Sequence, residues 1–92
     1  MIKRVMTITH AEFFRLLPKA LAGHHHVVNG HSICVATGSG SLEIELSPEN
    51  LRKFGSLDLM VTQGTFHFQN SSDEVRKNFL DRFEMTYYRG GG

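Results

Sequence analysis

The sequence is poor in the residues that would mark a specialised class of protein. It has one cysteine, two prolines and no tryptophan in 92 residues, and its formal net charge is +1. A single cysteine excludes an intramolecular disulfide, which fits a reducing compartment. The near-neutral charge excludes the strongly basic footprint of a dedicated nucleic-acid binder. The chain shows no signal-peptide pattern and no apolar run long enough to cross a membrane, so we expect a cytoplasmic protein without membrane contact.

The apolar content is that of a small globular domain. Hydrophobic residues make up 40% of the chain, and the seven phenylalanines would supply much of the core. A chain of this length forms one domain. We predict a single domain over residues 1–89 and a flexible glycine tail over residues 90–92.

Three segments carry helix signals. Thr9 and Glu12 form a capping box ahead of a pattern that ends near residue 22, although Pro18 predicts a kink or an early end. Ser47 followed by Pro48 is typical of a helix start and predicts a short helix ending by residue 55. A second capping box at 71–74 precedes apolar residues spaced by four, which predicts the longest helix.

The segments between these helices show strand signals. Asn29 and Gly30 predict a hairpin turn between strands at 24–28 and 31–36, and residues 42–46 alternate strictly between apolar and acidic. Gln63 and Gly64 predict a turn that joins strands at 57–61 and 65–69. We therefore predict an α+β fold with an antiparallel sheet of four to five strands, a meander plus a hairpin. Its helices pack on one face, in the order α-ββ(β)-α-ββ-α.

The histidines are the most unusual chemical feature. With a turn at residues 29 and 30, His26 would lie opposite Ile33, and His24, His26 and His31 would share one face of the hairpin. Imidazoles placed in this way could share a zinc ion or another transition metal. The alternative is that these histidines are part-buried and hydrogen-bonded, because their spacing matches no known zinc motif.

The only cysteine could be a reactive thiol. Cys34 would face His25 across the same hairpin, and a nucleophile needs such a base beside it. A buried structural thiol is the commoner role in an Ile-Cys-Val-Ala run. We therefore predict no enzymatic activity, and keep Cys34 as a candidate thiol.

The chain ends in Arg89 followed by three glycines. This tail resembles that of ubiquitin-like sulfur carriers and modifiers, which end in two glycines after a flexible stretch. The resemblance covers four residues, and here the tail follows a helix where that family has a strand. It implies a carrier whose terminal glycine carboxylate, at Gly92, is adenylated and then converted to a thiocarboxylate or a conjugate.

Several apolar and aromatic residues fall off the main faces of the predicted elements, and surplus of this kind is often covered by a partner. The predicted interface residues are Phe14, Met60, Met85, Tyr87, Tyr88 and Arg89. We therefore predict a small non-enzymatic interaction or accessory module that acts through a protein partner or as a homodimer. The alternatives are a metal-binding protein and a carrier. Nucleic-acid binding is disfavoured, because Glu43, Glu45 and Asp58 would repel phosphates.

Overall fold

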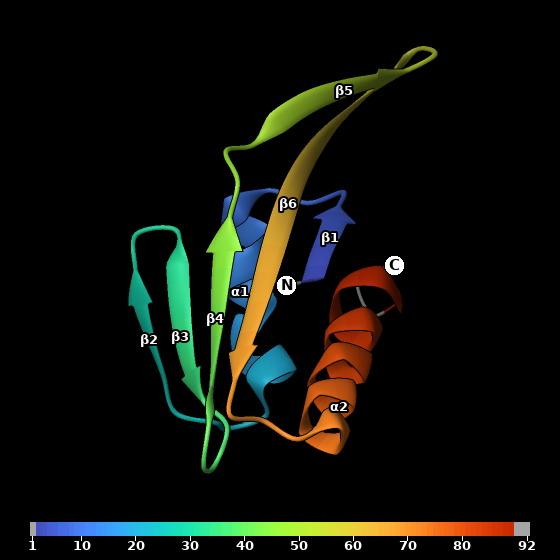
Figure 1. Ribbon diagram of the computed structural model, residues 1–92. Coiled ribbons are helices and arrows are strands. Elements are labelled where there is room, and N and C mark those ends of the chain that lie inside the picture. Colours follow the sequence, from blue (N-terminus) through green and yellow to red (C-terminus); the bar gives the residue numbers. More distant parts are fainter. Residues whose placement is uncertain (1, 90–92) are drawn as a thin grey trace.

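The computed structural model describes residues 2–89, with Arg89 placed by its backbone only (Figure 1). The predicted glycine tail at 90–92 lies outside the described residues. The elements in chain order are β1 (Ile2–Met6), α1 (His10–Leu21), β2 (His26–Asn29), β3 (Ser32–Ala36), β4 (Ser41–Leu46), β5 (Asn50–Phe54), β6 (Leu57–Gln69), α2 (Asp73–Glu84) and the π-helical turn η1 (Met85–Arg89).

The strands form one antiparallel sheet with the order β1-β6-β4-β3-β2, and β5 pairs with the first part of β6. Strand β6 is the longest, and it pairs with β1 along one side and with β4 along the other (Figure 1). Both helices contribute to one hydrophobic core against the sheet. The predicted α+β class, with an antiparallel sheet and helices on one face, is confirmed.

The core follows from the alternation of β4. Leu42, Ile44 and Leu46 are buried and point to the helices, because successive strand residues face opposite sides of the sheet. Phe66 lies opposite Ile44 on β6 and its ring meets that of Phe83 from α2 at 4.9 Å, edge to face. The other sheet face, here called the uncovered face, carries the alternate residues.

The predicted cap of α1 is confirmed, and the cap of α2 lies one residue later than the predicted box at 71–74, which has Ser71 and Glu74 at its ends. The side-chain oxygen of Thr9 accepts a hydrogen bond from the Glu12 amide at 3.2 Å, and that of Ser72 accepts from the Val75 amide at the same distance. Pro18 does not end α1, since the helix continues to Leu21. Proline has no amide hydrogen, so α1 loses the one hydrogen bond that residue 18 would donate to the carbonyl of Phe14.

Two predicted elements of the middle segment are wrong. Residues 50–54 form strand β5 instead of a short helix, and the turn predicted at Gln63 and Gly64 lies inside the 13-residue strand β6. Gly64 is a close-packing position and not a turn, since a Cβ there would lie 3.1 Å from the Met6 side chain. The turn instead uses Gly55, whose φ of +63° suits the first position of a two-residue hairpin loop.

The first strand was not predicted. Residues 2–6 pair with residues 62–66 of β6, far away in the sequence. Within residues 2–89, neither helix has the length and apolar character needed to cross a membrane.

Candidate functional site

The most distinctive feature of the molecule is a two-stranded hairpin that projects from the body of the domain (Figure 1). We call it the arm; it comprises β5, the turn at Gly55 and Ser56, and residues 57–61 of β6. The molecule measures 47 Å along its longest axis and 25 and 22 Å along the others. Its radius of gyration is 13.4 Å, whereas a compact domain of this length would have roughly 12 Å.

A bulge marks the point where the arm leaves the body. Leu46, the last residue of β4, lies opposite Gly64, and Asn50, the first residue of β5, lies opposite Val61. Residues 47–49 therefore stand against only two residues of β6. An extra residue on one strand bends that strand and increases its twist, and this accounts for the curved departure of the arm in Figure 1.

Ser47 holds the base of the arm through hydrogen bonds to β6. The Ser47 amide donates to the carbonyl of Gln63 at 2.8 Å, and the Ser47 hydroxyl oxygen accepts from the Gln63 amide at 2.8 Å. The chain from β4 to β5 thus stays on one edge of β6. On the opposite edge β1 ends with Met6 opposite Thr62. Among the described strands, none pairs with that edge of residues 57–61, which we call the free edge.

The arm exposes large apolar side chains. Leu51, Phe54 and Leu57 are 56%, 57% and 61% exposed, although strand residues of this type usually face a core. Leu59 and Met60 are half-buried. Single exposed apolar residues are common on protein surfaces. A group of them on one projecting element is typical of an interaction surface.

The register divides the arm into two faces. Phe54 lies opposite Leu57, and Arg52 lies opposite Leu59, so these four residues share one face with Val61. The other face carries two cross-strand pairs, Leu51 with Met60 and Lys53 with Asp58. Apolar side chains therefore occur on both faces, and the two basic residues of the arm both lie on β5.

The histidines predicted as a metal site do not assemble as expected. The hairpin turn is formed by Gly30 and His31, with His26 opposite Val35, so the predicted register is wrong by two residues. A two-residue loop of this kind has glycine at its first position, which places Asn29 in the strand. The ring of His31 lies edge-on to that of His10, 4.6 Å away. Among residues 2–89, no three His, Cys, Asp or Glu side chains are grouped so that they could hold a metal ion.

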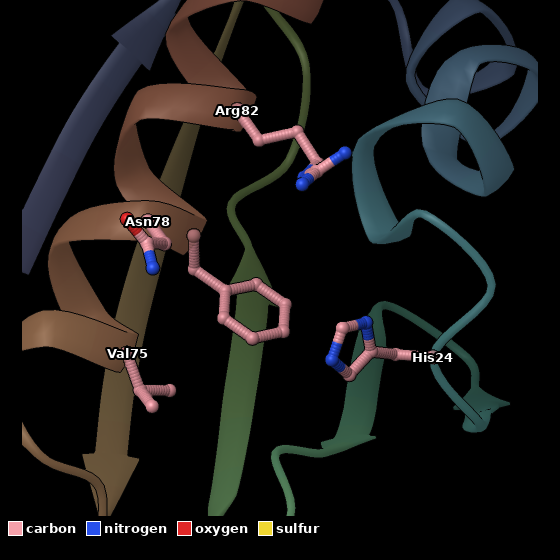
Figure 2. Close-up of a pocket in the computed structure, with 5 residues that line it drawn as sticks. His24, Val75, Asn78 and Arg82 are labelled. Atoms are coloured by element: carbon pink, nitrogen blue, oxygen red, sulfur yellow. The ribbon is translucent and has the colours of Figure 1, made fainter.

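His24 lies in the connection between α1 and β2 and faces α2 across a shallow pocket of about 180 Å³ (Figure 2). Its Nδ1 donates to the carbonyl of Leu21 at 2.8 Å, and its ring packs edge-on against Phe79 at 4.9 Å. Val75, Asn78 and Arg82 complete the lining. His24 is hydrogen-bonded, as in the alternative considered from the sequence, but the residue is exposed and not part-buried.

Cys34 lies on the uncovered face of β3 and is exposed. Its cross-strand neighbours are Val27 on β2 and Glu43 on β4, so His25 is not opposite it as predicted. Glu43 in turn lies opposite His67, and these side chains share a shallow open depression. The thiol is thus not the buried structural cysteine that its apolar neighbours in sequence suggested.

The predicted interface residues separate into three groups. Phe14 and Tyr87 pack against the core; the Tyr87 hydroxyl donates to the carbonyl of Phe13 at 3.0 Å, and burial raises the pKa of Tyr87. Met85 and Tyr88 are 63% and 47% exposed. The remaining two are Met60, which lies in the arm, and Arg89, whose side chain is outside the described structure.

Sequence reasoning therefore missed most of the arm. The signal that could have found it is Gly55 followed by Ser56 between two segments rich in apolar residues, which is typical of a two-residue hairpin loop.

Comparison of the chain with protein-family models found no match, and comparisons with curated proteins and with solved structures found none either.

Proposed function

We propose that this protein is a non-enzymatic interaction module that works as a homodimer, and that the arm is its contact element. The observation that carries the proposal is the combination of a free strand edge with exposed apolar side chains on the same projecting hairpin. A free edge offers unpaired backbone groups to another strand, and apolar neighbours add contact area.

The arm contributes little to the folding of its own chain, which supports a role outside it. Leu51, Phe54 and Leu57 belong neither to the hydrophobic core nor to the apolar residues packed against it. Leaving such side chains in water is unfavourable, by roughly 25 cal/mol for each Å² of apolar surface. A second copy presents the same surface, and a two-fold axis lets two identical edges pair reciprocally.

The mass in solution tests this proposal. We expect sedimentation equilibrium of the wild-type protein, over concentrations from about 1 µM to about 1 mM, to show a rise from 10.4 kDa toward twice that mass. The double variant Phe54→Thr/Leu57→Thr should remain at 10.4 kDa throughout. Threonine keeps the strand propensity and removes most of the apolar area.

A matched control changes two other exposed apolar strand residues. Val27 and Val28 on β2 are 57% and 46% exposed, and β2 is also an edge strand. The variant Val27→Thr/Val28→Thr should associate like the wild type. A wild-type mass of 10.4 kDa at every concentration would overturn the homodimer. An arm variant that still dimerises would show that the contact lies elsewhere.

A further inference from the structure

We infer that the two copies join through the free edge of β6, in an antiparallel register centred on Leu59, to form a four-stranded sheet β5-β6-β6-β5. This inference rests on the proposed homodimer and specifies which edge, which register and which residues make the contact.

The length of the free edge defines the register. It covers residues 57–61, with the turn at Gly55 and Ser56 at one end and the end of β1, opposite Thr62, at the other. Its middle residue is Leu59. A two-fold axis through Leu59 pairs the whole free edge of one copy with the whole free edge of the other. The tip of each arm then lies next to the last residue of β1 in the second copy, Met6.

The backbone groups point in the right direction for this register. The carbonyl and the amide of Gln63 are both hydrogen-bonded to Ser47, on the β5 side of β6. The backbone amides and carbonyls of the odd-numbered residues of β6 therefore point to the edge that β5 occupies. Alternation along a strand then turns the amides and carbonyls of Asp58 and Met60 to the free edge. With Leu59 at the axis, Asp58 of each copy lies opposite Met60 of the other, and the two pairs exchange four backbone hydrogen bonds.

The side chains agree with the backbone. Leu59 would face Leu59 of the second copy as a non-hydrogen-bonded pair, the closer type, with Cα atoms about 4.5 Å apart. Leu57 would face Val61 of the second copy. Together with Phe54, these residues from both copies form one continuous apolar strip across the joined sheet, and each Lys53 stays beside the Asp58 of its own arm.

Other pairings are less favourable. Shifting the β6 register by two residues toward the tip places Asp58 opposite Asp58, and like charges directly opposite destabilise a sheet. Shifting it the other way places Leu57 opposite Gln63 of the second copy, where β1 already occupies the edge. Pairing through β5 about its middle residue places Arg52 opposite Arg52. Charged residues at such an edge are a known protection against strand pairing.

Disulfide trapping tests the register. In a Cys34→Ser background, Leu59→Cys should give a covalent dimer under mild oxidation, because Cα atoms about 4.5 Å apart lie within the range for a disulfide. The matched control is Arg52→Cys. Arg52 lies opposite Leu59 and on the same face of the arm, but it belongs to β5, which forms the other edge of the arm. We expect a several-fold greater dimer fraction for Leu59→Cys. Mixing Asp58→Cys with Met60→Cys should cross-link the two proteins to each other, and neither should cross-link efficiently alone.

The outcomes separate the two proposals. If the wild type dimerises through the arm but Arg52→Cys cross-links and Leu59→Cys does not, the β6 register is wrong and the homodimer stands. Self-cross-linking of Asp58→Cys above that of Leu59→Cys would move the axis and also overturn the register. If the wild type does not associate at any concentration, both proposals fail. Circular dichroism of each reduced variant checks that it is folded.

Discussion

Two phenylalanine truncations compare the arm with the core. Phe66→Ala and Phe54→Ala remove the same side chain from opposite surroundings. Phe66 is 1% exposed and contacts Phe83, whereas Phe54 is 57% exposed at the tip of the arm. If the arm serves association and not folding, the two variants should differ strongly in their free energy of unfolding.

The expected magnitudes follow from burial. Replacing a buried phenylalanine by alanine leaves a cavity and costs about 3–5 kcal/mol. A domain of this length has a total stability of roughly 5–14 kcal/mol, so Phe66→Ala removes a large share of it. Its Tm should fall by more than about 10 °C. Phe54→Ala loses only strand propensity and its contact with Leu57, about 1 kcal/mol or less.

Urea unfolding followed by far-ultraviolet circular dichroism measures both values. Protein concentrations should be low, so that association does not add to the apparent stability. The dependence of the unfolding free energy on urea should be unchanged in Phe54→Ala, because the same surface unfolds. If Phe54→Ala loses as much stability as Phe66→Ala at these concentrations, the arm stabilises its own domain and is not reserved for association.

Two further predictions concern the body of the domain. Gly40→Ala should lower the free energy of unfolding by about 1–3 kcal/mol, because its Cβ would lie 2.3 Å from the Gln69 carbonyl oxygen; urea unfolding that matches Ser39→Ala would contradict this. Tyr87→Phe should lose about 0.5–1.5 kcal/mol with the hydrogen bond to Phe13. Burial raises the pKa of Tyr87 in the folded state, so the contribution of this tyrosine to stability should be fully present below pH ~10 and fall above it as the unfolded hydroxyl ionises. Urea midpoints between pH ~8 and pH ~11 should show a smaller fall in Tyr87→Phe than in the wild type, and an equal fall would exclude this tyrosine as a source.

The helices and the central strand were predictable because their signals are local. Thr9 and Ser72 cap backbone amides only three residues away; the Thr9 bond forms as predicted, and Ser72 takes the place of Ser71 in the predicted box. The alternation of residues 42–46 likewise places three apolar side chains on one face whatever lies beside the strand. These patterns were sufficient to predict the α+β class.

The middle of the chain was predicted wrongly because two local signals pointed away from the strands that form there. Ser47 with Pro48 indicated a helix, and Gly64 indicated a turn, yet both lie where strands meet. Residues 62–66 form a strand because β1 pairs with them, and Gly64 then lies between β1 and β4. No window of sequence around Gly64 contains that strand, so the long β6 and the arm built on it could not be predicted locally.

Local sequence was enough to place the start of α1, the start of α2 to within one residue, and the residues of β4 that face the core, because each depends on neighbours within a few residues. It also indicated surplus apolar surface, with Met60 as the one predicted residue that lies in the arm. That this surface includes Leu51, Phe54 and Leu57 on a projecting hairpin became visible only in the folded chain. Exposure and free edges depend on which distant strands occupy the other positions of the sheet, and pairing between distant strands is a property of the whole fold.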